Sequence, residues 1–255
     1  MGKNGHTKPI SLEPVREESF WMIAKNRFHR FVSFFTKPGF AFRLTRHTLR
    51  PFVKTFLIRS IEGLENIPKD TPVIVAFNHQ SYFDFICFIA IAPDNIHYLA
   101  AEKFFTHPFW KVAMKLTGQI KVERTSKEKD AVHATVYSHL EQKRMIGIFP
   151  EGTRSLSPTH MLEAFTGVAK YALGAKVPVV PVGIRGTYDV LPKGGKFPAI
   201  KKIVSFHVGK PMHFHDFYKE EITLGDYEQV TELIMQEISR LSGKVHVGVK
   251  KHAEK

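Results

Sequence analysis

Apolar residues follow two different patterns along this chain, and the change between them lies near residue 61. Up to that point, large apolar side chains recur every three or four positions, which is the spacing of amphipathic helices. Beyond it, short runs of β-branched residues alternate with longer segments of helical period. Strand–helix alternation of this kind predicts an α/β domain with a largely parallel central sheet flanked by helices.

We expect the α/β domain to occupy residues 62–243. Its strands are predicted at residues 73–77, 96–100, 119–123, 145–149, 178–184 and 203–208. Its helices are predicted at residues 82–92, 108–116, 127–143, 163–174 and 226–241. The basic residues 244–255 follow, and we expect them to form a disordered tail.

Residues 1–61 are expected to form a polar tail and a two-helix motif. Phenylalanines with interleaved Lys and Arg recur at helical spacing in residues 20–35 and again in residues 44–57. Pro38-Gly39 separates the two helices, and Pro51 is expected to kink or divide the second. Such helices are typical of a segment that lies in the headgroup region of a membrane. The alternative is that both helices pack on the domain and expose only their charges.

The charge distribution favours a membrane surface as the anionic partner. The chain carries a net charge of +13, and residues 19–61 contribute nine Lys or Arg and no Asp or Glu. No recognised nucleic-acid-binding motif accompanies this charge, so we predict no nucleic-acid partner. No apolar run approaches the roughly 18 residues of a membrane span, and the first residues lack the apolar region of a signal peptide. We therefore expect a peripheral, monotopic protein on the cytoplasmic face of a membrane.

The first candidate site is the segment from Asn78 to Asp84. It follows the strand expected at residues 73–77, and Ser81 with Asp84 forms a capping-box pair that marks the start of a helix. His79 thus lies in a strand-to-helix turn, across which its imidazole and the Asp84 carboxylate are able to converge. An Asp oxygen that accepts the proton of one ring nitrogen leaves the other nitrogen free as a base. The alternative is structural: Asp84 caps the helix, and His79 is a turn histidine.

A second motif follows the strand expected at residues 145–149. Residues 150–155 read Pro-Glu-Gly-Thr-Arg-Ser. A glycine turn at the carboxyl end of a sheet strand, with an arginine beside it, is suited to bind phosphate. A polar surface turn has the same composition, so this motif is weak evidence when it stands alone.

The two motifs together closely resemble those of the glycerolipid acyltransferase family, whose best-known members are 1-acylglycerol-3-phosphate (lysophosphatidate) acyltransferases. The segments 78–84 and 149–154 resemble its first and third blocks. Residues 103–124 resemble the second block and residues 177–184 the fourth, in the expected order. The resemblance covers roughly residues 62–215. It departs at Thr166, where the family often has a lysine, so one phosphate or headgroup contact of the family is missing here.

The resemblance implies that a fatty acyl group passes from a thioester to the free hydroxyl of lysophosphatidate, which gives phosphatidate. His79 would act as the general base for direct attack, and Asp84 would orient its imidazole. Arg154, with Lys103 and Arg124, would hold the phosphate of the acceptor. The alternative for Lys103 and Arg124 is that they are ordinary surface cations.

The same loop is expected to serve the reacting carbonyl. The backbone N–H of Gly152, or that of its neighbour Thr153, would donate to the developing oxyanion. Glu151 would organise the loop that carries Arg154. We expect no resident cofactor, since acyl-CoA or acyl carrier protein would deliver the acyl group as a co-substrate.

A metal site and two other functions are the alternatives to this interpretation. The histidines at positions 207, 213 and 215 cluster in the sequence without the carboxylate spacing of a known site, so we predict no metal. An acyltransferase with another acceptor remains open: another lysophospholipid, glycerol 3-phosphate or a non-phosphate lipid. A non-catalytic membrane lipid-binding protein is the alternative from a different class.

Overall fold

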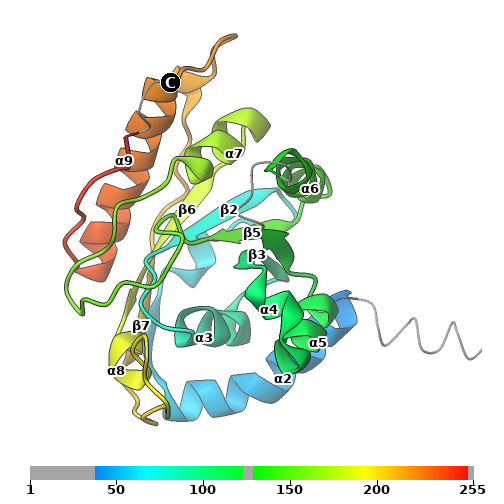
Figure 1. Cartoon of the computed structure of the whole chain (residues 1–255), viewed down its shortest axis with the longest axis vertical. Coiled ribbons are helices and arrows are strands. Elements are labelled where there is room, and N and C mark those ends of the chain that lie inside the picture. The colour runs from blue at the N-terminus through cyan, green and yellow to red at the C-terminus, as the bar shows by residue number, and fades with distance from the viewer. Residues whose placement is uncertain (1–37, 123–128, 252–255) are drawn as a thin grey trace, which may run out of the picture.

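The computed structural model describes residues 38–122 and 129–251 and builds them around one seven-stranded sheet (Figure 1). The strands are β1 (Ile58–Glu62), β2 (Val73–Phe77), β3 (Ile96–Ala101), β4 (Ile120–Val122), β5 (Met145–Ile148), β6 (Val179–Arg185) and β7 (Val204–Val208). Their order across the sheet is β1-β7-β6-β2-β5-β3-β4. Neighbouring strands run parallel except β6 and β7, which are antiparallel. The predicted α/β class and largely parallel sheet are confirmed.

Helices cover both faces of this sheet. They are α2 (Pro38–Phe56), α3 (Phe83–Ile91), α4 (Lys103–Thr106), α5 (Pro108–Leu116), α6 (Lys129–Glu141), α7 (Gly167–Ala175), α8 (Thr187–Val190) and α9 (Leu224–Ser242), with the 3-10 turns η1 (Leu64–Asn66) and η3 (His215–Phe217). The helices predicted between residues 82 and 241 are all found, with ends that differ by a few residues. No helix in the described ranges is both long and apolar enough to cross a membrane.

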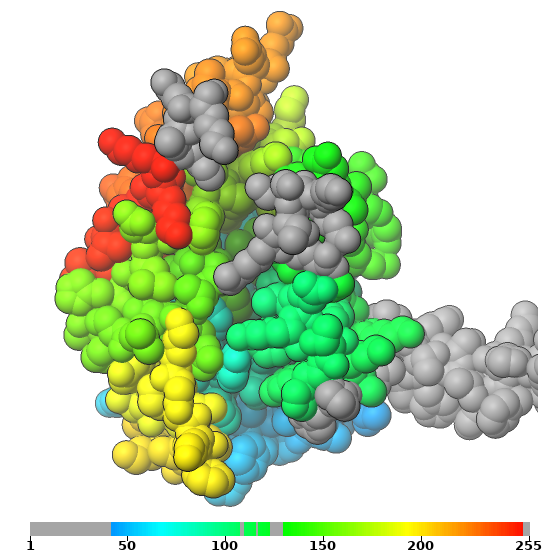
Figure 2. Space-filling model, viewed as in Figure 1, coloured from blue at the N-terminus to red at the C-terminus, as the bar shows by residue number. Residues whose placement is uncertain are grey.

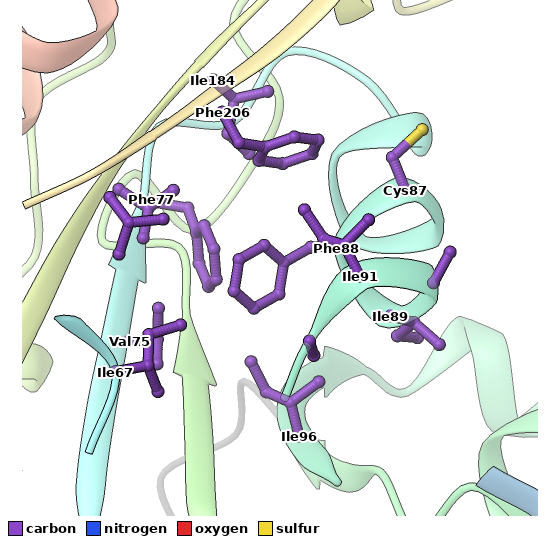
Figure 3. Packing of buried hydrophobic residues seen from close by; sticks show 14 of the residues in the cluster. Ile67, Val75, Phe77, Cys87, Phe88, Ile89, Ile91, Ile96, Ile184 and Phe206 are labelled. Carbon is purple, nitrogen blue, oxygen red and sulfur yellow. The ribbon is translucent and has the colours of Figure 1, made fainter. Parts of the chain in front are cut away.

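Strand β2 lies at the centre of the sheet, and its side chains face two separate cores. Val75 and Phe77 belong to the core that α2 and α3 cover, whereas Ile74 and Ala76 belong to the core beneath α6, α7 and α9. Figure 3 shows the first core, in which the Phe77 and Phe88 rings meet with centroids 4.7 Å apart. Burial on both faces explains why this strand is an unbroken apolar run instead of an alternating one.

Strand β1 crosses the domain boundary expected between residues 61 and 62. It pairs in parallel with β7 at one edge of the sheet, and Leu57 just before it is buried. The apolar pattern does not predict this strand, because exposed Arg59 and half-buried Ser60 interrupt it, as an edge position allows. Within the described residues, the α/β domain therefore begins before residue 62.

Residues 244–251 are ordered, so the disordered tail expected there is wrong for this part of the chain. Val245 and Val249 form isolated parallel bridges with His160 and Ala164. Valines alternate at positions 245, 247 and 249, which is a strand pattern within a basic segment. Two of these valines pair with the loop after β5, although lysines lie beside them in the sequence.

Helix α2 packs on the domain with one face only. Phe42 and Val53 are buried against the first core, and the Arg46 guanidinium donates to the Ala92 and Pro93 carbonyls at the end of α3, at 3.0 and 3.2 Å. The helix runs through Pro51, so the division expected there is wrong. Pro51 lies on the exposed side, where water is able to satisfy the carbonyl that loses its N–H partner.

The outer face of α2 carries both charge and apolar surface. Leu44, Phe52 and Phe56 are each exposed by between 43% and 55%, and cations surround them. The packing alternative is thus correct for the inner face, but the outer face exposes more than charges. The helix predicted at residues 20–35 lies outside the described residues, and the membrane role of the motif stays a prediction.

Candidate active site

Asn78 fixes the end of β2 at the point where the first motif begins. Its buried side-chain amide donates to the Ile184 carbonyl at 3.0 Å and accepts from the Ile184 N–H at 2.7 Å. An asparagine side chain thus continues the sheet pairing between β2 and β6 where the backbone of β2 turns away. No role for Asn78 was predicted from the sequence, although a side-chain amide directly after a buried strand needs hydrogen-bond partners such as these.

His79 and Asp84 converge across the turn between β2 and α3. The His79 Nδ1 lies 2.8 Å from the Asp84 Oδ2, which also accepts the N–H groups of Gln80 at 2.7 Å and Ser81 at 2.9 Å. Asp84 is fully buried. A carboxylate that accepts two backbone donors acts as an acceptor for Nδ1–H as well, which leaves Nε2 of the imidazole as the basic atom. The same oxygen holds the backbone of the turn before α3, although the helix start has no side-chain cap, so Asp84 has a structural role beside its contact with the imidazole.

The imidazole is also held from the second motif. Its ring stacks on Phe149 with centroids 4.0 Å apart. The buried Glu151 Oε1 accepts the backbone N–H of His79 at 2.6 Å, and its Oε2 accepts the backbone N–H of Leu162 at 2.7 Å. Burial raises the pKa of Glu151 to about 7, although both N–H donors favour its charged form. Glu151 therefore joins the turn after β2 to the loop after β5.

The glycine of the second motif is required by its backbone. Gly152 has a φ of +65°, and a Cβ there would lie 2.9 Å from the Phe165 ring. Its N–H donates to the Phe149 carbonyl at 2.9 Å and closes the turn. Of the two oxyanion donors expected from the sequence, Thr153 is then the better placed, since its N–H has no acceptor among the described residues.

Two of the three expected phosphate-binding cations lie on the wall of one cavity with His79. The Arg154 guanidinium carbon lies 3.7 Å above the Tyr82 ring centroid, and the Lys103 Nζ lies 5.5 Å from that of Phe104. Within the described residues, neither cation has a carboxylate partner. Both charges are therefore available to an anion. Arg124 lies outside the described residues.

Sequence reasoning missed a further cation at this loop. The Lys193 Nζ donates to the Arg154 carbonyl at 3.2 Å and lies 3.5 Å from the Thr153 hydroxyl. It comes from the loop after α8, far from both motifs in the sequence. The only signal is a lysine between Pro192 and two glycines, which is a common surface composition. Lys193 brings a positive charge to a site that lacks the family's lysine at Thr166.

The cavity itself is deep and mainly apolar. It has a volume of about 450 Å³, within the range of ligand sites. Beyond the residues of the two motifs, its walls come from α3, β3, α4, α5 and β4. Apolar or uncharged side chains that line it include Phe85, Ile89, Tyr98, Leu99, Met114, Gln119 and Val122. A charged end beside His79 and an apolar body suit an amphiphilic substrate.

The C-terminal segment forms hydrogen bonds with the loop that follows the second motif. Val245 and Gly248 carbonyls accept the N–H groups of Met161 and Ala164, at 2.9 and 3.1 Å, and the Lys244 Nζ donates to the Pro158 carbonyl at 2.6 Å. Leu162, which binds Glu151, lies between those two paired positions. The ordered tail therefore helps to position the loop whose Glu151 contact holds the turn after β2.

The described residues contain no group of three His, Cys, Asp or Glu side chains placed to hold a metal ion. The His213 and His215 rings stack on each other, and the His207 Nδ1 lies 3.1 Å from the Glu62 Oε2. The histidine cluster of the sequence is thus divided between a ring stack and a hydrogen bond. The absence of a resident metal stays a prediction.

Comparisons with known proteins find relatives of this chain. The Acyltransferase family model matches residues 58–185, which contain both motifs and β1 to β6. The 1-acyl-sn-glycerol-3-phosphate acyltransferase of Bacillus subtilis is 26% identical over 71% of this chain and 86% of its own length. The Saccharomyces cerevisiae enzyme of the same name is 31% identical over 64% of this chain and 54% of its own length.

A solved structure shows the same fold. The 1-acyl-sn-glycerophosphate acyltransferase PlsC of Thermotoga maritima matches with a TM-score of 0.64 at 22% identity, over 89% of this chain and 94% of that protein. The matched family model spans half of this sequence and starts at the first residue of the sheet. The chain therefore belongs to the Acyltransferase family.

Proposed function

We propose that this acyltransferase moves a fatty acyl group from an acyl thioester to the free hydroxyl of lysophosphatidate, giving phosphatidate. The observation that carries the proposal is the 2.8 Å contact between His79 Nδ1 and Asp84 Oδ2 on the wall of an apolar cavity that also holds Arg154 and Lys103. The names of the relatives support this acceptor. The donor is acyl-CoA or acyl carrier protein.

The base acts through the ring nitrogen that Asp84 does not occupy. His79 Nε2 takes the proton of the acceptor hydroxyl as its oxygen attacks the thioester carbonyl, and Asp84 stabilises the imidazolium. The carbonyl oxygen gains negative charge, and the Thr153 N–H is the proposed donor to it. When the carbon–sulfur bond breaks, the imidazolium returns the proton to the thiolate. The products are phosphatidate and the free thiol of the donor.

The cations select an acceptor that carries phosphate. Arg154 presents a planar fork suited to two phosphate oxygens, and its stacking on Tyr82 limits the orientations of that fork. Lys103 on the same cavity wall and Lys193, which donates to the Arg154 carbonyl, add positive charge. Arg124 remains part of the proposal from the sequence. A phosphate held here would place the neighbouring hydroxyl of a glycerol backbone toward His79.

The protein is proposed to work as a peripheral, monotopic enzyme on the cytoplasmic face of a membrane. Both substrates carry long acyl chains that partition into a bilayer. The outer face of α2, with exposed Phe52 and Phe56 among cations, is suited to the headgroup region. No nucleic-acid partner is proposed.

The test is acyl transfer to lysophosphatidate in mixed micelles, with long-chain acyl-CoA and acyl carrier protein as separate donors. We expect His79→Ala to lower the rate by roughly 10²–10⁴-fold, which is the usual contribution of a general base. His213→Ala, which removes an exposed histidine, is the matched control and should retain the wild-type rate. Activity that survives His79→Ala in a folded protein would contradict the mechanism.

A panel of acceptors separates this reaction from its alternative. Other lysophospholipids, glycerol 3-phosphate and monoacylglycerol are offered under the same conditions. A preference for one of these over lysophosphatidate would assign a different acceptor and leave the proposed role of His79 unchanged. Inactivity of the wild type with every acceptor and both donors would refute the enzymatic proposal.

A further inference from the structure

The loop of residues 191–202 joins α8 to β7 and stands out beside the C-terminal end of α2 (Figure 2, yellow beside blue). Two large apolar side chains on it have little cover: Phe197 is 87% exposed and Ile200 is 59% exposed. Phe197 is the most exposed large apolar side chain in the described residues. A single exposed apolar residue is ordinary, but an almost bare phenylalanine with isoleucine three residues away forms a patch.

Positive charge surrounds this patch. Lys193, Lys196, Lys201 and Lys202 lie within the loop, and the sequence has no Asp or Glu between residues 190 and 215. Lys196, Lys201 and Lys202 are exposed, and none has a carboxylate partner in the described part of the chain. An apolar tip ringed by lysines matches an anionic bilayer, where acyl chains lie beneath negative headgroups.

The loop is tied at its base to the active site and to α2. The Ser81 hydroxyl donates to the Leu191 carbonyl at 2.7 Å, and Lys193 binds the Arg154 carbonyl. At its far end, the Val204 N–H donates to the Leu57 carbonyl at 2.9 Å, directly after α2. A surface that contacts the loop would therefore also lie close to both catalytic motifs and to the end of α2.

We propose that residues 191–202 form a second membrane-contacting element, in which Phe197 and Ile200 enter the headgroup–acyl boundary and the lysines bind anionic headgroups. This inference rests on the proposed membrane location of the enzyme. The outer face of α2 presents the same combination of phenylalanine and cations, and the loop lies beside the C-terminal end of this helix. That continuity favours a bilayer over an acidic protein as the occupant.

A fluorescent label at position 197 tests the contact directly. The only cysteine, Cys87, is fully buried, so Phe197→Cys in the full chain directs an environment-sensitive dye to the loop. With vesicles of phosphatidylcholine and phosphatidylglycerol, we expect a blue shift and quenching by lipids that carry a quencher on the acyl chain. Leu233→Cys on α9, also a partly exposed apolar position, should show neither change.

Partition measurements test the energetic contribution. Phe197→Ser should weaken binding to anionic vesicles by about tenfold, since burying one large apolar side chain is worth that much or more. The triple change of Lys196, Lys201 and Lys202 to Gln should weaken it by about tenfold to a hundredfold, and only on anionic vesicles. Acyl transfer in micelles should stay unchanged, because these residues lie outside the catalytic machinery. Leu233→Ser and Lys210→Gln are the matched controls.

Each contrary outcome has its own meaning. A chain that binds vesicles while the label at position 197 stays in a water-like environment would overturn the loop contact and leave the membrane proposal intact. A chain that does not sediment with vesicles would overturn both, and acyl transfer in micelles would still test the reaction. A label that responds to acyl carrier protein but not to vesicles would assign the loop to the donor and overturn the inference.

Discussion

The two sides of the active-site cavity are held in different ways. On the catalytic side, one fully buried Asp84 oxygen accepts three N–H donors, and His79 is stacked on Phe149. On the cation side, Arg154 rests on the face of Tyr82, and Lys103 is exposed. Neither cation is locked by a carboxylate among the described residues.

In the proposed mechanism, this difference separates the proton transfer from the choice of acceptor. The proposed base, His79, is positioned before any substrate arrives, because buried hydrogen bonds are strong and directional. The cations keep freedom to follow the headgroup, since exposed charges on long side chains are weakly restrained. Changes on the catalytic side should therefore lower the turnover rate, and changes on the cation side should alter acceptor affinity.

Asp84→Asn gives the largest expected effect and tests the catalytic side. The asparagine oxygen is able to keep the N–H bonds of Gln80 and Ser81, so the turn should persist. It no longer stabilises the imidazolium, and kcat should fall by roughly 10²–10⁴-fold with little change in acceptor KM. Steady-state kinetics and circular dichroism measure both properties. Asp94→Asn, which changes an exposed carboxylate outside the site, should behave as wild type. A comparable loss of kcat in this control would show that the effect is not specific to Asp84.

Arg154→Ala tests the cation side. Loss of a charge-assisted phosphate contact should raise the KM for lysophosphatidate by roughly 10–100-fold. Arg154→Lys keeps the charge without the planar fork, so its KM for lysophosphatidate should lie between those of the wild type and Arg154→Ala. Monoacylglycerol, which has no phosphate, should be used as poorly by the variants as by the wild type. If Arg154→Ala lowered kcat instead of raising KM, the two sides would not be separable. Arg59→Ala is the control for an exposed arginine.

Removal of residues 244–255 tests whether the tail belongs to the catalytic side. The deletion breaks the backbone bonds that hold residues 159–164, including those on either side of Leu162. We expect a loss of roughly 2–6 kcal/mol in the free energy of unfolding, at the usual value per hydrogen bond, and about a tenfold lower kcat. A chain that ends at Lys251 keeps these bonds and is the control. Equal activity of the two truncated chains would show that residues 244–251 do not position the active site.

The smallest expected effect is a pH dependence carried by Glu151. Its pKa is about 7 in the folded chain and near 4 when unfolded, so between these values the folded state binds more protons. The free energy of unfolding contributed by this group therefore falls as pH rises from about 4 to about 7. Glu151→Gln should remove about 1–3 kcal/mol of that fall, as measured by urea unfolding across this window. Glu163→Gln, an exposed carboxylate, should leave the slope unchanged.

The sequence alone determined the features that depend on local order. Strand 73–77 was predicted with its observed ends, and helix 108–116 likewise, because an apolar run or a helical period within one segment is a local signal. The family and the α/β class also followed from motifs and alternation along the chain. The turn that carries His79 and Asp84 is local as well, since five residues separate them.

Only the tertiary structure decided the contacts between segments far apart in the sequence. Lys193 reaches the loop of Arg154 across 39 residues, and the Asn78 amide pairs with Ile184 across 106. Edge strand β1 and the segment 244–251 have weak patterns of their own. Strand β1 is held by β7, and the segment is held by the loop after β5 and by α9. A contact of this kind leaves no period in the sequence, because its partner is chosen by sheet order and packing.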